Sequence, residues 1–445
     1  MTRIVILGGG ESGVGSAVLA ARKGFEVFLS DSGKLKDSYR EMLLSEGIPF
    51  EEGGHTESRV LEAAEVIKSP GIPETAPLVR KIYASGIPVI SELEFAARYT
   101  TARKVCITGS NGKTTTTMLI WHILKKAGLH VGLGGNVGDS FALQVANGNY
   151  DCYVLEISSF QLDNMYDFKA DIAILTNITP DHLDRYDYSF EKYTASKFRI
   201  LQNQGPDDAF IYFLDDPVIA GWLEHHRIAA ASYPFTLTDV PQENGAWISE
   251  GQIWTRIHKT PWNMFLEKLA LQGRHNACNS MAAGIAAQLM SVRSETLRDS
   301  LSDFQNVEHR LEYVARVHGI EFINDSKATN VNSTWYALEC QSRPVIWIAG
   351  GTDKGNDYSE LLPLVKARVK GLVCLGVDNI KLHKAFGGIV PAITEATTMM
   401  EAVKKAYLMA DDGDVVLLSP ACASFDRFEN YEDRGRKFKN AVREL

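Results

Sequence analysis

The chain has 445 residues, of which 45% are hydrophobic and 23% charged, and its formal net charge is −9. Such a length predicts about three domains of ordinary size, and the composition is that of a soluble globular protein rather than a disordered or fibrous one. The acidic balance without a dense lysine and arginine stripe argues against a nucleic-acid-binding protein, and the absence of a signal peptide or a long apolar run argues against a membrane protein, so we expect a cytoplasmic one.

Short apolar runs alternate with helical stretches across residues 1–98, which predicts a parallel sheet with helices on both faces. The turn Gly8–Gly13 follows the first of these strands, and Asp31 ends the next one. This spacing is typical of a Rossmann dinucleotide fingerprint. The motif leaves three interpretations open: a site for NAD or FAD, a site for another diphosphate ligand, and a purely structural turn.

The segment KVCITGSNGKTTTT at residues 104–117 predicts a strand, a glycine turn and the start of a helix. Backbone N–H groups and the helix N-terminus would face phosphates, Lys113 would supply positive charge, and a threonine hydroxyl could hold Mg²⁺. The usual spacing G-x-x-x-x-G-K-[ST] is not met, because Ile107 stands five residues before Gly112. We therefore expect a shortened phosphate loop that binds a nucleoside triphosphate, the alternative being a structural glycine turn.

Three polar residues that follow the phosphate loop are ambiguous when each is taken alone. Glu156 ends the apolar strand CYVLEIS, where a carboxylate can bind Mg²⁺ but is more often simply solvated. His182, in TPDHLD, would ordinarily be a hydrogen-bonded loop histidine. Lys197 lies within the helical stretch EKYTASKFRI, where a single lysine is usually on the surface.

The rest of the chain predicts an antiparallel insertion and a further α/β part. Short runs at 208–266 (AFIYFL, AWISEG, QIWTRI and WNMFLE) indicate an antiparallel insertion or edge. Two β-rich runs joined at His318-Gly319 indicate a hairpin, after which strands and helices alternate again. The six cysteines stand singly, which fits reduced buried thiols, and Cys422 fits core packing. We predict an α/β protein of three domains, 1–98, 99–306 and 307–445, each built on a mainly parallel Rossmann-like or P-loop sheet.

Several long segments resemble the bacterial Mur ligases, among them TGSNGKTT, EISSFQL, NITPDHLDRY, GRHNACN, INDSKATN and SPACASFD. The resemblance extends from residue 4 to the C-terminus. It implies an ATP- and Mg²⁺-dependent ligase that joins D-glutamate to UDP-N-acetylmuramoyl-L-alanine through an acyl phosphate, in peptidoglycan precursor synthesis. The nearest alternative is a sister Mur ligase that adds L-alanine, a diamino acid or a dipeptide.

The resemblance also implies roles for individual residues in the central and C-terminal parts. Phosphates of ATP would lie against Gly109, Ser110, Asn111, Gly112, Lys113, Thr114 and Thr115. Further ATP contacts would come from Asn276 and Asn279 at the adenine and from Arg310, Asp325 and Lys327. Metal ions would be held by Thr114, Glu156 and His182, and Lys197 would be carbamylated and face the metals. Lys113, His182 and Lys197 would be the catalytic residues.

For the two substrates, the resemblance turns the N-terminal fingerprint into a site for the uridine diphosphate group. The matching positions are Glu11, Ser12, Asp31, Ser32, Ser69, Pro70 and Gly71, with Asn136 at the muramoyl part. D-Glutamate would contact Thr329, Lys354, Ser424 and Tyr431, the serine preceding a helix expected to start near Phe425. Tyr431 departs from the phenylalanine expected in many relatives. The partners are these small molecules, with neither nucleic acid nor membrane, and we expect a monomer.

Two functions from other classes explain less of the sequence. A nicotinamide oxidoreductase would account for residues 1–98 but leaves the phosphate loop without a role. A nucleotide-switch binding module would account for the phosphate loop but not for the N-terminal nucleotide fold or the segment INDSKATN.

Overall fold

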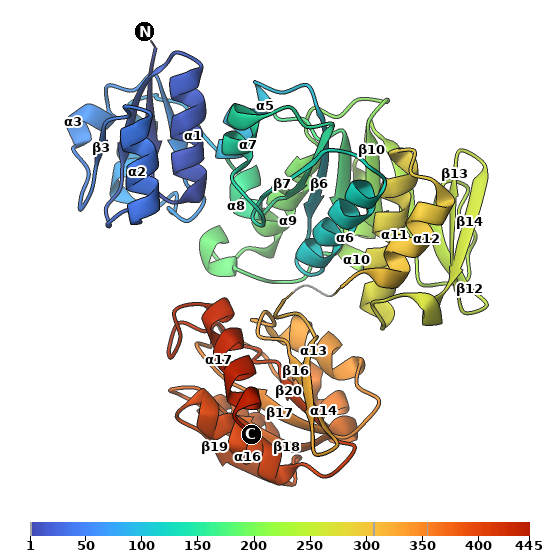
Figure 1. Cartoon of the computed structure of the whole chain (residues 1–445). Helices are drawn as coiled ribbons and strands as arrows, with labels where there is room; N and C mark the ends of the chain where they lie inside the picture. Colours follow the sequence, from blue (N-terminus) through green and yellow to red (C-terminus); the bar gives the residue numbers. More distant parts are fainter. Residues whose placement is uncertain (1, 306–307, 354) are drawn as a thin grey trace. The chain divides into compact units, whose positions relative to one another are not determined.

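The computed structural model describes residues 2–305, 308–353 and 355–445. Three mainly parallel sheets flanked by helices follow one another along the chain (Figure 1), which confirms the α/β class expected from the sequence. One compact unit runs to Leu269 and resumes over Cys278–Asp303, and the second comprises Ala270–Ala277 and Phe304–Leu445. Within the described residues, no helix combines the length and the apolar character that crossing a membrane requires. All six cysteines are described, and none forms a disulfide.

The N-terminal sheet has five parallel strands and apolar cores on both faces. Ile4 and Ile6 pack into one core while Val5 and Leu7 pack into another, because successive side chains of a strand point to opposite faces. The strand order is β3 (Phe50–Glu51), β2 (Glu26–Ser30), β1 (Arg3–Leu7), β4 (Glu65–Lys68) and β5 (Val89–Ile90). The helices are α1 (Glu11–Arg22), α2 (Asp37–Ser45), α3 (Glu57–Val60), α4 (Pro77–Ala84) and α5 (Glu92–Ala97).

The central sheet has nine strands and becomes antiparallel only at one edge. In spatial order they are β14 (Thr260–Phe265), β13 (Gln252–Ile257), β12 (Gly245–Ser249), β11 (Ala231–Phe235), β10 (Ala209–Phe213), β9 (Ile172–Leu175), β6 (Arg103–Thr108), β8 (Cys152–Glu156) and β7 (Val131–Gly135). The antiparallel edge expected at 208–266 is confirmed for β12, β13 and β14. It is wrong for AFIYFL, because β10 pairs in parallel with both neighbours and its apolar residues are buried on both faces.

Helices cover this sheet and join it to the N-terminal one. They are α6 (Lys113–Lys126), α7 (Phe141–Asn147), α8 (Ser159–Leu162), α9 (Phe190–Phe198), α10 (Pro217–His225), α11 (Arg274–Leu289) and α12 (Ser294–Asp303), with 3₁₀ turns η1 (Leu183–Tyr186), η2 (Arg199–Leu201) and η3 (Leu266–Lys268). One continuous apolar core includes Ile4 and Val14 from the N-terminal sheet and α1, Phe141 from α7, and Cys106 from β6. The first two sheets therefore share a core through α1, α5 and α7.

The C-terminal sheet has six strands, and a hairpin forms its one antiparallel pair. The order is β15 (Glu312–Val317), β16 (Ile320–Asn324), β20 (Val415–Leu418), β17 (Val345–Ala349), β18 (Val369–Cys374) and β19 (Ala392–Glu395). The hairpin expected at His318-Gly319 is confirmed, and both residues have the positive φ (46° and 80°) that a two-residue type I′ turn requires. The helices are α13 (Val331–Glu339), α14 (Leu362–Arg368), α15 (Ile380–Phe386), α16 (Met399–Met409) and α17 (Tyr431–Arg443), with a 3₁₀ turn η4 (Ser359–Leu361).

The helix expected near Phe425 begins later than the sequence suggested. Residues 424–428 form a turn in which the N–H of Phe428 donates to the carbonyl of Ser424. The helix α17 starts at Tyr431, because the Asn430 side chain accepts from the N–H of Asp433 and caps it. Ser424 therefore does not precede a helix N-terminus that could favour an anion.

Candidate active site

The loop 109–112 joins β6 to α6 in the backbone shape that the sequence predicts. Gly109 (φ 144°) and Gly112 (φ 82°) take dihedral angles that L side chains rarely adopt. A Cβ atom at Gly109 would lie 2.0 Å from Thr176 Oγ1, and one at Gly112 would lie 2.5 Å from Asn279 Oδ1. Glycine is thus required at both positions, and α6 begins at Lys113 with its first N–H groups at the loop, as in an anion site.

Residues after β9 hold this loop in place, and the sequence analysis assigned them no role of their own. Asn177 accepts from Ser110 N through its carbonyl (2.9 Å) and from Asn111 N through its Oδ1 (2.9 Å). Thr176 Oγ1 donates to the carbonyl of Asn111 at 2.6 Å. The available signal was a Thr-Asn pair directly after the apolar run IAIL, where a parallel strand ends beside the strand that precedes the loop.

Two lysine side chains converge on one carbonyl of the loop. Gly109 O accepts from Lys113 Nζ at 2.7 Å and from Lys197 Nζ at 2.8 Å. Lys197 is only 2% exposed, so the surface lysine that its helix alone suggested is wrong. Burial, and then repulsion from Lys113, lower the pKa of Lys197 well below its ordinary value. The amine of Lys197 is therefore neutral far more readily than an exposed lysine.

The candidate metal ligands lie at the same end of the central sheet. Glu156, 1% exposed, ends β8, and its Oε1 accepts from Asn136 Nδ2 at 2.8 Å. Its charge acts on Lys197 by raising the pKa of that amine against the effect of burial. Thr114 is buried in the first turn of α6, so a carboxylate and a hydroxyl, the hard oxygen donors that Mg²⁺ prefers, fit such an ion.

His182 lies in the loop between β9 and α9. Its φ is 51°, its ring meets the ring of Phe160 edge-on at 5.4 Å, and its side chain is 43% exposed. The neighbouring Asp181 carboxylate lies 3.7 Å from His182 Nε2. The imidazole of His182 thus lies partly exposed in this loop, beside a carboxylate.

At the N-terminal sheet, the acid of the fingerprint closes the glycine turn. Asp31 Oδ2 accepts from Gly9 N at 2.5 Å and Oδ1 from Gly33 N at 2.6 Å, with Ser32 exposed between these contacts. A Cβ atom at Gly8 would lie 2.5 Å from Ser69 Oγ, so the turn and Ser69 are in contact. The carbonyl of Gly71, next to Pro70, accepts from Arg185 at 3.0 Å.

A buried acid that the sequence analysis missed ties the start of α1 to α7. Glu92 accepts from Ser140 Oγ (2.5 Å), Ala142 N (3.1 Å) and the Ser12 hydroxyl, and burial raises its pKa. Glu11 Oε1 accepts from Ser140 N at 3.1 Å. Ser12 is therefore held by Glu92 at the start of α5, and Glu11 by Ser140, which caps α7.

The start of α11 carries both candidate adenine contacts. Asn279 Oδ1 accepts from Thr116 Oγ1 at 3.1 Å, which places this residue against the phosphate-loop helix. Asn276 lies three residues earlier on the same helical face, and its Nδ2 donates to Gln272 O at 2.9 Å.

In the C-terminal unit, Asp325 is buried and accepts from Ser419 Oγ (2.9 Å) and Leu311 N (3.2 Å). Burial raises its pKa to about 7, and the nearby charge of Arg310 opposes that shift. The ammonium group of Lys327 lies 3.8 Å from the centroid of the Tyr431 ring, a cation–π contact. The structure thus brings together Arg310 with Asp325, and Lys327 with Tyr431.

The other candidate amino-acid contacts are more dispersed. The N–H of Thr329 donates to Lys327 O at 2.8 Å, just before α13. Ser424 is buried at 2% exposure in the turn after β20. Lys354 lies outside the described residues, so its expected contact with D-glutamate stays a prediction. Cys422 is buried, in line with core packing.

Comparison with known families and proteins finds matches along the whole chain. The profile of the MurD N-terminal domain matches residues 3–77, that of the Mur ligase middle domain 107–287, and that of the Mur ligase glutamate ligase domain 309–422. The UDP-N-acetylmuramoylalanine–D-glutamate ligase of Porphyromonas gingivalis is 57% identical over 443 residues, covering 99% of this chain and 98% of the relative. The enzyme of that name from Bacteroides fragilis is 56% identical, covering 100% of both chains.

Solved structures of lower identity share the fold. UDP-N-acetylmuramate-alanine ligase of Thermotoga maritima has a TM-score of 0.63 at 16% identity, covering 100% of both chains. The ADP complex of the MurF ligase from the same organism has a TM-score of 0.59 at 15% identity, covering 95% of this chain and 97% of that one. These identities support the three-part architecture and nothing finer.

Proposed function

Since the chain belongs to the Mur ligase family, we propose that it is an ATP-dependent ligase that joins D-glutamate to UDP-N-acetylmuramoyl-L-alanine. The reaction forms an amide bond in peptidoglycan precursor synthesis and releases ADP and phosphate. The observation that supports this chemistry best is the convergence of Lys113 and Lys197 on the carbonyl of Gly109, in a glycine loop at a helix N-terminus.

The reaction needs activation, because the oxyanion of a carboxylate does not leave. The alanyl carboxylate attacks the γ-phosphorus of ATP, the bond to the bridging oxygen of ADP breaks, and an acyl phosphate forms. The amine of D-glutamate then attacks the acyl carbon, loses a proton, and phosphate leaves. In phosphoryl transfer the protein mainly positions groups and neutralises charge. We assign these tasks to Lys113 and the 109–115 backbone, with Asn276, Asn279, Arg310, Asp325 and Lys327 as further ATP contacts.

Mg²⁺ would be held by Thr114, Glu156, His182 and a modified Lys197, and when bound it would neutralise phosphate charge. We infer that Lys197 is carbamylated. A neutral amine nitrogen can add to the carbon of CO₂ and release one proton, and the burial of Lys197 beside Lys113 favours that neutral form. The product is an anion, which would remove the repulsion between the two lysines.

We propose that the substrates divide between the ends of the chain. Residues 1–98 bind the uridine diphosphate group through Glu11, Ser12, Asp31, Ser32 and the turn 69–71, while Asn136 contacts the muramoyl part. Residues 99–306 bind ATP, and residues 307–445 bind D-glutamate through Thr329, Lys354, Ser424 and Tyr431. We also propose that the enzyme works as a monomer in the cytoplasm, where both ATP and a nucleotide-sugar precursor are available.

The test is a substrate panel. Protein, ATP, Mg²⁺ and UDP-N-acetylmuramoyl-L-alanine are incubated with D-glutamate, L-alanine, a diamino acid or a dipeptide, and phosphate release is followed with Lys113→Ala as the inactive control. Among these four, we expect only D-glutamate to give phosphate release. L-Alanine would leave the hydrogen-bond donors for the second carboxylate unpaired, and unpaired buried donors can favour the correct substrate by about 10⁴-fold. Preference for another amino acid would assign a sister activity, and no release with any of them would refute the ligase.

A further inference from the structure

Arg434, in the first turn of α17, is a buried cation that forms no ion pair with a carboxylate of the described residues, although the charges of Asp426 and Asp325 act on it from further away. Its side chain is 1% exposed, and burial lowers its pKa to about 10. All three of its hydrogen bonds go to uncharged acceptors: Nε to Ser326 Oγ (3.0 Å), one terminal nitrogen to Ser326 O (2.8 Å) and the other to Cys422 O (3.1 Å). Across the part of the chain that the structure describes, no carboxylate forms an ion pair with it. Burying a guanidinium group without an ion pair costs free energy, which suggests that this arginine has a specific role.

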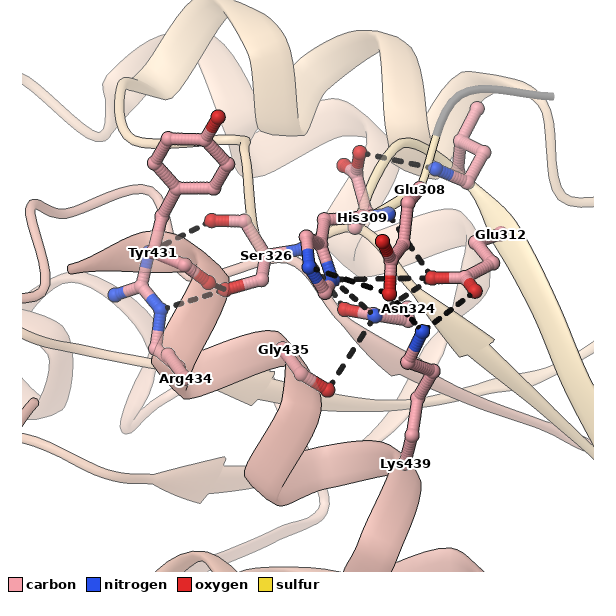
Figure 2. A network of polar contacts seen from close by, with 11 residues as sticks. Glu308, His309, Glu312, Asn324, Ser326, Tyr431, Arg434, Gly435 and Lys439 are labelled. Atoms are coloured by element: carbon pink, nitrogen blue, oxygen red, sulfur yellow. Dashed lines mark hydrogen bonds and ion pairs between the residues drawn. The ribbon is translucent and has the colours of Figure 1, made fainter. Parts of the chain in front are cut away.

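That role follows from what Ser326 connects. Ser326 stands between Asp325 and Lys327, and its hydroxyl also donates to the carbonyl of Tyr431 at 2.8 Å (Figure 2). The Tyr431 ring in turn lies against the ammonium group of Lys327. The first turn of α17 therefore contacts the segment 325–327 at three places: the backbone of Ser326, the hydroxyl of Ser326 and the side chain of Lys327.

The same helix surface holds the segment around Arg310. A Cβ atom at Gly435 would lie 2.2 Å from His309 Nδ1, so the glycine leaves room for the buried imidazole. His309 Nδ1 and Glu312 both lie within hydrogen-bond distance of Asn324 Nδ2 (2.8 and 2.9 Å), and Lys439 bonds Glu308 and Glu312 (Figure 2). The carbonyl of His309 accepts from Lys327 N at 3.1 Å, which links the two segments directly.

We propose that Arg434 is a positioning residue of the ligation reaction, holding the segment 325–327 and the turn 422–424 in one fixed arrangement. It touches neither substrate, and acts through Asp325 and Lys327 on ATP and through Ser424 on the amino acid. The proposal rests on the ligase function proposed above. Only a planar fork with donors on three nitrogens can reach two acceptors on Ser326 and one on Cys422 at once, so lysine cannot replace it.

Arg434→Lys keeps the charge and most of the volume, while Ser326→Ala removes the hydroxyl from the other side of the same contact. Arg443→Lys, exposed in the last turn of α17, is the matched control. We expect Arg434→Lys to lower kcat by about 10²-fold and raise the KM for ATP, because a displacement near 1 Å can cost that much. The KM for UDP-N-acetylmuramoyl-L-alanine should stay within about twofold, since its predicted contacts lie in the other unit. Ser326→Ala should show the same pattern with a smaller loss.

Melting temperatures and direct titration of Mg-ADP accompany the kinetics. A folded Arg434→Lys protein with normal kcat and normal KM for ATP would overturn the proposal. Equal changes in all three KM values together with a lowered melting temperature would also overturn it, because they indicate a merely structural role. If Arg434→Lys does not fold, Ser326→Ala decides by the same criteria. Failure of the ligase function itself would appear differently, as a wild-type protein without phosphate release.

Discussion

At the scale of single residues, Lys197 shows how far a local pattern can mislead. Its helix predicts a solvated lysine, yet the side chain is 2% exposed and bonds the phosphate loop at Gly109. Two ammonium groups buried side by side repel each other and lose hydration. This cost disappears when the amine of Lys197 is neutral or has been converted to an anion.

We therefore expect Lys197→Ala to be nearly inactive and to regain some turnover when acetate or formate is added. A small carboxylate can enter the space left by the side chain and supply the missing negative charge. Phosphate release against carboxylate concentration is the measurement, with Lys192→Ala, on the exposed side of the same helix, as control. Full activity of Lys197→Ala without any addition would contradict the assignment.

Asp325 gives a prediction for stability against pH. Burial raises its pKa to about 7 in the folded protein, against an ordinary value of 3.8, so the folded state favours the protonated form. The contribution of the protonated acid to stability is full below the unfolded pKa and is lost as pH rises through the folded pKa. One unit of pKa corresponds to about 1.4 kcal/mol, so the raised pKa of Asp325 changes the free energy of unfolding by a few kcal/mol between low and high pH.

Relative to the wild type, Asp325→Asn should accordingly have a higher free energy of unfolding at pH 8 than at pH 5. At pH 8 the wild type buries a charged carboxylate, and the substituted protein does not. Urea unfolding of both proteins at the two pH values measures the difference. A gap that is the same at pH 5 and pH 8 would show that Asp325 titrates normally. Activity of Asp325→Asn is a separate matter, since the carboxylate is also a candidate ATP contact.

At the scale of elements, the docking of α17 depends on one glycine. Replacing a glycine inside a helix by alanine ordinarily stabilises by about 0.5–1 kcal/mol. At Gly435 the new methyl group would overlap the buried His309 ring, and overpacking of this kind costs about 1–3 kcal/mol. The overlap should therefore outweigh the gain in helix propensity.

We expect Gly435→Ala to destabilise the protein and Gly221→Ala to stabilise it slightly. Gly221 lies within α10, and a Cβ atom there would meet nothing within 4 Å. Equilibrium unfolding of the two variants gives free energies of opposite sign relative to the wild type. The same sign for both would mean that the His309 ring moves aside at little cost.

Much of the element pattern could be predicted from the sequence, and the misses have physical causes. Alternating strands and helices, the glycine turns and the His318-Gly319 hairpin are encoded locally, by apolar periodicity and by residues that tolerate positive φ. The run AFIYFL was assigned to the antiparallel edge because strand direction depends on partners elsewhere in the chain. The start of α17 at Tyr431 was missed because its cap, Asn430, had to compete with an equally plausible start near Phe425.

The candidate site was predictable wherever a motif carried it and not where distant contacts build it. The phosphate loop follows from residue type and spacing, whereas Glu156 is ambiguous by itself and became a candidate only through the family resemblance. Asn177, Glu92 and Arg434 are not predictable in this way, because each of them contacts a segment far away in sequence. Their signals, a polar pair after a strand or an arginine next to a glycine in a helix, are common in structural roles as well.

At the scale of the whole molecule, two nucleotide-type folds in one chain raise the question of which ligand each binds. Each carboxylate oxygen of Asp31 already accepts one hydrogen bond within the turn, from the N–H of Gly9 or of Gly33. We expect the N-terminal part to bind a UDP-sugar and not NADH. Titration of NADH fluorescence with the intact protein should give no saturable signal at micromolar concentrations, while UDP-N-acetylmuramoyl-L-alanine should bind. Saturable NADH binding would revive the oxidoreductase hypothesis.

The core shared by the first two sheets has a consequence for synthesis on the ribosome. The apolar face of α1, with Val14 and Val18, packs into the same core as Phe141 of α7 and Tyr153 of β8. When residue 98 has just been translated, α1 can pack on the N-terminal sheet, but it still lacks the part of the core that lies about 50 residues further along the chain. At about 5–20 residues per second the delay amounts to roughly 3–10 s. During this interval the nascent N-terminal part exposes apolar surface, and transiently exposed apolar surface of this kind is prone to aggregation.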